Sequence, residues 1–321
     1  MKKRKIGLAL GAGGARGLTH IGVLKVLHKH KIFPDYIAGT SMGAIVGAAY
    51  AAGHSPDELQ QIVHTTQWKN MVDFTVPKAG LIKGHLMEKK IRDLVFHKQF
   101  NELNIPLKVV SYNLTKREPV IFDKGDVAKA VRASSSIPGI FAPVRFRNGH
   151  YVDGAVANPT PYDVVKAMGA DIVIAVDLYK KEKQVKRGTK ISEQTLMQEL
   201  KEKFVYEELT NLNQWLASKR RSKLGRAVAL WLLNKFLYPK KVLKIMVGKD
   251  LPEFTKVMFQ STSVMTHNLA QARLACAKID VLIQPNLKGL RWSDFDKAEK
   301  FIALGEKAMM NKIGEIKKKL R

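Results

Sequence analysis

The fold is decided by one stretch of the sequence, Ile37–Ala38–Gly39–Thr40–Ser41–Met42–Gly43–Ala44–Ile45–Val46–Gly47. Its first residues form a short apolar run typical of a strand, and the alanine-rich residues 44–52 predict a helix. Gly39 and Gly43 flank Ser41 in the pattern G-x-S-x-G, which is typical of a nucleophile elbow. In that strained turn, a Cβ atom two residues to either side of the serine would collide with the neighbouring strand or helix. The stretch therefore predicts a serine presented at a sharp turn between a strand and a helix.

This pattern alone also fits an ordinary strand-to-helix turn, so two further stretches are needed to choose. The glycine-rich loop Gly11–Gly17 lies between an apolar strand candidate at 5–10 and helical periodicity at 18–30. Its backbone N–H groups can converge on a negative charge. A dinucleotide fold would place a glycine where Arg16 stands and an acidic residue at the end of the second strand, whereas Asp35 precedes that strand. The loop therefore fits an oxyanion hole beside a serine better than a nucleotide site.

The third informative stretch, residues 150–159, contains the sequence Asp153–Gly154–Ala155. An Asp-Gly pair alone is usually a turn. Here it follows a strand-like run and precedes small residues that lead to a predicted helix at 162–168, so it places a carboxylate at a strand end. Residues 170–177, with a contiguous apolar run at 172–176, then predict a buried parallel strand.

Together these stretches resemble the patatin-like phospholipase family, in its bacterial branch and in the catalytic domains similar to neuropathy target esterase. The matching motifs are Gly11–Gly17 as G-x-G-x-x-R-G, Gly39–Gly43 as G-x-S-x-G, and Asp153–Ala155 as D-G-A, in the same order and spacing. The resemblance is strong over residues 5–180 and resumes near 281–308. It implies a three-layer α/β fold with a mainly parallel sheet, related to α/β-hydrolases, and a Ser–Asp dyad in place of a triad.

The resemblance also implies roles for single residues. Ser41 would correspond to the nucleophile and Asp153 to the base, and backbone amides of the glycine-rich loop would correspond to the oxyanion hole. The residues of that hole would be Gly13, Gly14, Ala15 and Arg16. The motif glycines are Gly11, Gly17, Gly39, Gly43 and Gly154. No metal and no cofactor is expected in this scheme.

The chemistry can also be argued from the residues. A serine hydroxyl is a weak nucleophile until a neighbouring base accepts its proton, and histidine is the usual base. Among the nine histidines, only His150 lies at a strand end, and we expect it to point away from the strand that carries Asp153. We expect a surface or capping role for His20, on the first predicted helix. A dyad of Ser41 and Asp153 accounts for the lack of a better histidine.

Length and composition indicate one domain spanning residues 1–321, since 45% of the residues are hydrophobic. The single cysteine, Cys276, excludes an intramolecular disulfide and a Cys-based zinc cluster, and we expect it to fill the core. No secretory leader and no apolar run of about 18 residues is visible, so we expect a cytoplasmic protein.

The formal net charge of +27 favours an anionic partner. Residues 180–250 hold 18 basic and 7 acidic residues around a cluster of tryptophan, leucine and phenylalanine, and we expect a helical insertion there. Such a segment is typical of an interfacial helix on an anionic membrane. A helical cap packed on the core is the alternative, and nucleic-acid binding is disfavoured because no recognisable motif accompanies the charge.

The remaining elements are read from periodicity, caps and turns. Strands are predicted at 107–113, 119–122 and 281–284, and helices at 56–63 with Ser55 as N-cap, 86–95, 126–132, 257–278 and 295–319. Residues 134–139 break the chain as a structural loop or as the lining of an acyl-chain entrance.

The sequence thus predicts a serine lipid acyl hydrolase of the phospholipase A or lysophospholipase type. Its substrate would be a phospholipid or lysophospholipid, met at the cytoplasmic face of a membrane. The alternatives are a non-catalytic, membrane-associated regulatory protein that keeps the fold, and a nucleotide-binding module.

Overall fold

The fold is described from a computed structural model of the chain. The structure describes residues 4–66, 73, 82–146, 149–179 and 253–320. The described residues before and after 180–252 form one compact unit. The predicted basic insertion at 180–250 lies outside the described residues.

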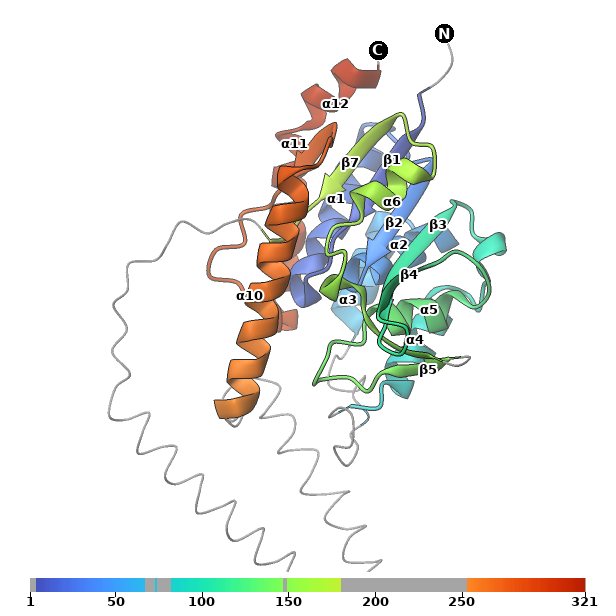
Figure 1. The fold of residues 1–321 in the computed structure, drawn as a ribbon. Coiled ribbons are helices and arrows are strands. Elements are labelled where there is room, and N and C mark those ends of the chain that lie inside the picture. Colours follow the sequence, from blue (N-terminus) through green and yellow to red (C-terminus); the bar gives the residue numbers. More distant parts are fainter. Residues whose placement is uncertain (1–3, 67–72, 74–81, 147–148, 180–252, 321) are drawn as a thin grey trace, which may run out of the picture. The chain divides into compact units, whose positions relative to one another are not determined.

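The centre of this unit is a mixed, eight-stranded sheet (Figure 1). Its strands are β1 (Ile6–Leu10), β2 (Tyr36–Thr40), β3 (Leu107–Asn113), β4 (Glu118–Phe122), β5 (Val144–Phe146), β6 (Gly149–Asp153), β7 (Ile172–Val176) and β8 (Val281–Ile283). The order is β5-β6-β3-β2-β1-β7-β8, with β4 also paired to β3. Strands β3, β2, β1, β7 and β8 run parallel, whereas β4 and β6 are antiparallel to β3. The predicted parallel sheet is therefore confirmed for the centre, and antiparallel strands extend one side.

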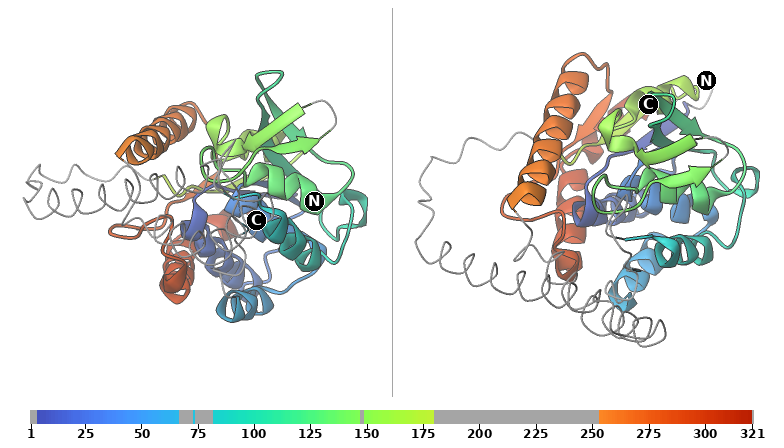
Figure 2. Two further views of the ribbon diagram at one scale, coloured as in Figure 1. Left: turned by 90° about the horizontal axis from the view of Figure 1, so that it is seen from below. Right: turned by 60° about the horizontal axis from the view of Figure 1, so that its bottom comes forward.

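Helices cover both faces of the sheet. They are α1 (Thr19–Lys29), α2 (Met42–Ala52), α3 (Pro56–Thr65), α4 (His85–Leu94), α5 (Val127–Ser134), α6 (Tyr162–Ala167), α10 (Glu253–Ala275), α11 (Ala298–Met310) and α12 (Ile313–Leu320). Because successive side chains of a strand point to opposite faces, β1 contributes Leu8 to one buried cluster and Ala9 to the other. The first cluster includes residues of α1, α2, α5 and α11, and the second includes Val164 and Val165 of α6. Figure 2 shows α10 on one side, with α1, α3 and α11 on the other, so the predicted three-layer α/β architecture is confirmed.

The predicted elements agree with the structure to within a few residues, and the caps explain several boundaries. Ser55 begins α3 with a capping box, in which its hydroxyl accepts the Glu58 N–H at 3.2 Å and the Glu58 carboxylate accepts the Ser55 N–H at 2.7 Å. No helix among the described residues is long and apolar enough to cross a membrane.

Two predictions about the C-terminal third are wrong. The single helix predicted at 295–319 is a 3-10 turn followed by α11 and α12, with a break at residues 311–312. The break lets α12 turn Ile316 into the same core that holds Phe301 of α11. Cys276 does not fill the core but is exposed, because it directly follows α10, which buries Thr266 and Ala270 on a different face.

Candidate active site

Ser41 occupies the turn between β2 and α2 and has the backbone angles φ 56° and ψ −123°. A non-glycine residue rarely adopts a positive φ, so the turn is strained. The flanking glycines are required by close approach: a Cβ atom on Gly43 would lie 2.1 Å from the Leu10 carbonyl oxygen, and one on Gly39 would lie 2.6 Å from the Ala44 Cα. The turn between strand and helix that the sequence predicted is therefore present, with its serine at the apex.

Asp153 is the last residue of β6, which pairs with β3 through Ser111 and Asp153, while β3 lies next to β2. This strand order brings Asp153 to Ser41, whose side chain acts to lower the pKa of the carboxyl group. The Asp153 carboxylate also accepts the Ala155 N–H at 2.9 Å. A Cβ atom on Gly154 would lie 2.3 Å from a carbonyl oxygen of β3, so this glycine lets the chain turn closely over that strand.

Both members of the pair are shielded from solvent, with Ser41 5% and Asp153 4% exposed. Burial raises the pKa of Asp153 to about 6, against the opposing effect of the Ser41 side chain and of the hydrogen bond from the Ala155 N–H. The carboxyl group is thus ionised at neutral pH and is a stronger base than an exposed aspartate.

Two hydrogen bonds hold the strained turn in place. The Ser134 hydroxyl, at the end of α5, accepts the Ser41 N–H at 2.9 Å. The Thr40 hydroxyl donates to the Asn158 carbonyl oxygen at 2.9 Å and so joins the turn to the chain after Asp153. The sequence predicts a loop or the lining of an acyl-chain entrance at 134–139 but no contact from Ser134, because nothing in three consecutive serines indicates which hydroxyl reaches the turn.

Arg132 is 2% exposed and binds the loop that follows α5. It donates to the Ser136 hydroxyl at 2.5 Å, and the Ser136 carbonyl accepts the Asp153 N–H at 2.9 Å. It also donates to the carbonyl oxygens of Lys83, Gly84 and Ala142. Burial lowers the pKa of Arg132 to about 10, which leaves it charged at neutral pH. The guanidinium therefore holds the loop whose Ser136 carbonyl oxygen accepts the Asp153 N–H.

The glycine-rich loop lies beside the elbow, since a Cβ atom on Gly17 would lie 2.4 Å from the Met42 side chain. Several of its amides are engaged with the rest of the chain. The Gly11 N–H donates to Val176, the Ala12 N–H to Pro159, the Ala15 N–H to Trp292, and the Arg16 N–H to Gly13. Of the residues predicted for the oxyanion hole, Gly13 and Gly14 keep amides without an acceptor among the described residues, whereas the Ala15 amide is in use.

Two histidines near the motifs have different surroundings. His20 is fully buried, so the expected surface or capping role is wrong. Its Nε2 lies 2.7 Å from the Gly11 carbonyl oxygen, and burial lowers the pKa of His20 to about 4, so a neutral ring donates to that carbonyl. The side chain of His150 is exposed and lies 3.3 Å from the Thr115 hydroxyl, away from Asp153 as expected.

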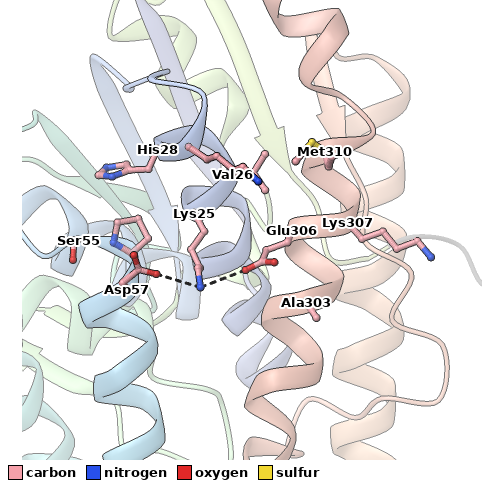
Figure 3. Close-up of a pocket in the computed structure, with 11 residues that line it drawn as sticks. Lys25, Val26, His28, Ser55, Asp57, Ala303, Glu306, Lys307 and Met310 are labelled. Atoms are coloured by element: carbon pink, nitrogen blue, oxygen red, sulfur yellow. Dashed lines mark ion pairs between the residues drawn. The ribbon is translucent and has the colours of Figure 1, made fainter.

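A pocket of about 680 Å³ lies between α1, α3 and α11, away from the motifs (Figure 3). Lys25 projects into it and forms ion pairs with Asp57 at 3.2 Å and Glu306 at 3.5 Å. None of the predicted site residues lines this pocket, so it carries no part of the proposed chemistry. Over the described part of the chain, no group of three or more His, Cys, Asp or Glu residues could hold a metal ion.

Comparison with known families supports the resemblance seen in the sequence. Residues 8–166 match the family model described as patatin-like phospholipase. This region of the chain is patatin-like. The matched residues carry the glycine-rich loop, the elbow at Ser41 and the strand end at Asp153, so the patatin-like region contains every motif on which the resemblance was based.

Several relatives of this patatin-like chain are similar over 54% of its length. An uncharacterised NTE family protein of Mycobacterium tuberculosis is 35% identical over 176 residues, which cover 49% of that relative. Human patatin-like phospholipase domain-containing protein 6 is 33% identical over 181 residues and lysophospholipase nte1 of Aspergillus fumigatus 31% identical, with 13% and 12% of their lengths covered. The patatin-like chain therefore spans half or less of the length of these curated relatives.

Among solved structures, the patatin-like chain is similar to VipD from Legionella pneumophila, with a TM-score of 0.53 at 13% identity. The match covers 97% of this chain and 66% of VipD. At this identity the similarity concerns the fold alone.

Proposed function

We propose that this patatin-like protein is a serine lipid acyl hydrolase of the phospholipase A or lysophospholipase type. The observation that carries the proposal is the buried pair of Ser41 and Asp153, in which a serine at a strained turn contacts a carboxyl group whose pKa is raised to about 6. A nucleophile with an adjacent base is the arrangement that activates a hydroxyl group. The names of the family and of the fungal relative support lipid esters as the substrate class.

The reaction would proceed in two halves. Asp153 takes the proton of the Ser41 hydroxyl as Oγ attacks the ester carbonyl carbon, and the amides of Gly13 and Gly14 donate to the oxyanion that forms. Asp153 returns the proton to the alcohol as the ester bond breaks and an acyl-enzyme remains. Water then attacks the acyl group while Asp153 accepts its proton, and the fatty acid leaves as Ser41 regains a hydrogen. Loss of one oxyanion donor would raise the barrier by about 2.7–4 kcal/mol.

The test is hydrolysis of a short-chain p-nitrophenyl ester and of phospholipid and lysophospholipid vesicles. We expect Ser41→Ala and Asp153→Asn to lose activity on all of them while remaining folded. Ser55→Ala is the matched control, because it removes a hydroxyl that caps α3 far from the elbow, at a cost of about 1 kcal/mol in stability. Activity retained in Ser41→Ala would refute the assignment of the nucleophile, and an inactive wild type would favour the regulatory alternative.

We also propose that the protein binds the inner face of the cytoplasmic membrane as a peripheral protein, through its basic insertion. The support is the sequence of residues 180–250, with its excess of 11 positive charges. Wild-type protein should bind anionic vesicles, with binding weakened by salt, and should not bind zwitterionic ones.

The matched variants for that test replace three basic residues by glutamine, either in the insertion (Lys219, Arg220 and Arg221) or in α12 (Lys317, Lys318 and Lys319). We expect the first set to reduce vesicle binding and the second to leave it near the wild-type level. Equal effects of both sets would show that overall charge, and not the insertion, governs binding.

A further inference from the structure

The glycine-rich loop is held by a short segment from the far end of the chain, residues 290–294, which we name the closing loop. The Ala15 N–H donates to the Trp292 carbonyl oxygen at 2.7 Å. The Arg16 side chain donates from Nε to the Leu290 carbonyl oxygen at 3.1 Å. The side chain of Arg16 is therefore directed to the closing loop, which gives this arginine a partner that its motif does not predict.

The backbones of the two loops are in direct contact. Gly14 has φ 57°, and a Cβ atom there would lie 2.6 Å from the Trp292 carbonyl oxygen. A side chain at this position would push the closing loop away and release the Ala15 amide. The conformation of the glycine-rich loop thus depends on where the closing loop places one carbonyl group.

Asp294 shapes the closing loop from within. It is 2% exposed, and one carboxylate oxygen accepts the Arg291 N–H at 3.1 Å and the Lys297 ammonium at 2.8 Å. The other oxygen accepts the Arg291 Nε–H at 2.9 Å. Although burial raises the pKa of Asp294, the hydrogen bonds from Lys297 and Arg291 lower it to about 2. One ionised carboxylate accepts all three hydrogen bonds, so the turn depends on this one side chain.

The closing loop leads into α11, which packs closely on α1, the helix that follows the glycine-rich loop. A Cβ atom on Gly22 would lie 2.0 Å from the Ile302 carbonyl oxygen, and one on Gly305 would lie 2.0 Å from the Thr19 carbonyl oxygen. The two loops are therefore attached to a pair of helices whose backbones are in contact. Because these helices are closely packed, we expect a change in the closing loop to alter the glycine-rich loop and not the distance between the helices.

We propose that the closing loop is a positioning element of the oxyanion hole and that Asp294 is its positioning residue. By engaging the amide of Ala15 and the side chain of Arg16, the loop fixes the orientation of the Gly13 and Gly14 amides. This inference rests on the proposed function, because it assigns those two amides to the oxyanion.

The test compares Asp294→Asn with Asp296→Asn. Either orientation of an asparagine amide at 294 would turn its NH₂ group toward one of the three donors, so the loop must change. Asp296 is exposed and lies two residues away, so its variant makes the same change of charge without that conflict. We expect kcat to fall about tenfold or more in Asp294→Asn with KM changed less than about twofold, because a misplaced donor weakens transition-state binding. Asp296→Asn should match the wild type.

Amide hydrogen exchange of the peptide covering residues 11–18 is the second readout, and it does not depend on turnover. We expect exchange in this peptide to be about tenfold faster in Asp294→Asn than in the wild type, and unchanged in Asp296→Asn. Unchanged exchange in Asp294→Asn, or a wild-type kcat, would overturn the inference. Activity that survives in the Ser41→Ala variant would instead refute the proposed function. The exchange data would still decide whether the closing loop holds the glycine-rich loop.

Discussion

The Asp153→Asn variant should be more stable than the wild type at neutral pH, although we expect it to be inactive. An asparagine at this position would keep the shape of the side chain, and its oxygen could still accept the Ala155 N–H. What the substitution removes is an ionised carboxylate at a site that is 4% exposed. The effect on stability should therefore come from charge, not from packing.

The magnitude follows from the pKa of Asp153, which burial raises from 3.8 to about 6. Between these two values the folded state holds a proton that the unfolded state has released, so stability falls as pH rises through this window. The loss of folding stability caused by the buried charge of Asp153 is absent below about pH 4 and complete above about pH 6. A shift of about two pKa units corresponds to about 3 kcal/mol at neutral pH.

The assay is urea denaturation of wild type and Asp153→Asn at intervals from pH 4.5 to pH 7.5. We expect the stability advantage of the variant to grow by about 2 kcal/mol across this range, because the cost develops mainly below pH 6. Asp296→Asn, at an exposed aspartate, is the control for the change of charge alone. An advantage that stays constant with pH, or a variant that becomes less stable as pH rises, would refute the raised pKa. In the wild type, ester hydrolysis should rise with pH through about 6, since Asp153 must be ionised to accept a proton.

Three further outcomes can be measured on the same protein. Ser41→Gly should be inactive but about 1 kcal/mol more stable than Ser41→Ala in urea denaturation, because glycine adopts a positive φ without strain; equal stabilities would contradict the strain at the elbow. Gly43→Ala should lose about 3 kcal/mol or more, since its Cβ would lie 2.1 Å from the Leu10 carbonyl, whereas Gly314→Ala, in α12 with open space around it, should be neutral or slightly stabilising. Cys276 should react with a thiol reagent in the folded protein as fast as in urea, and a protected thiol would contradict its exposure.

The sequence could predict the elbow because its requirements are local. A sharp turn from a strand into a helix that packs on the next strand requires glycines at the positions of Gly39 and Gly43. The reason is that a Cβ atom at either position would collide with nearby backbone atoms. The same holds for Ser55, whose capping box involves residues three apart. Asp153 could be placed at a strand end from its flanking residues, and the pairing of β6 with β3 then determines how close it comes to Ser41.

The contacts that hold the elbow and the glycine-rich loop could not be predicted in this way, because they join segments far apart in the chain. Ser134 reaches Ser41 only because α5 ends beside β2, and the carbonyl of Trp292 belongs to a loop whose sequence shows no motif. The prediction for His20 is wrong for the same reason: helical periodicity indicates which residues share a face, but not which loop lies against that face. Cys276 shows the converse, since an apolar residue type does not ensure a buried position.

The energetics of the elbow bear on the choice between an enzyme and a regulatory protein that keeps the fold. Ser41 holds a strained backbone, and Asp153 holds a charge in a buried site, and neither feature stabilises the protein. A protein selected only for its shape would gain stability by replacing Ser41 with glycine and Asp153 with asparagine, since both substitutions suit the surrounding backbone. The two unfavourable features meet in one pair of neighbouring residues, to which the proposed function assigns the roles of nucleophile and base. The presence of both in the same turn therefore favours catalysis over a structural role.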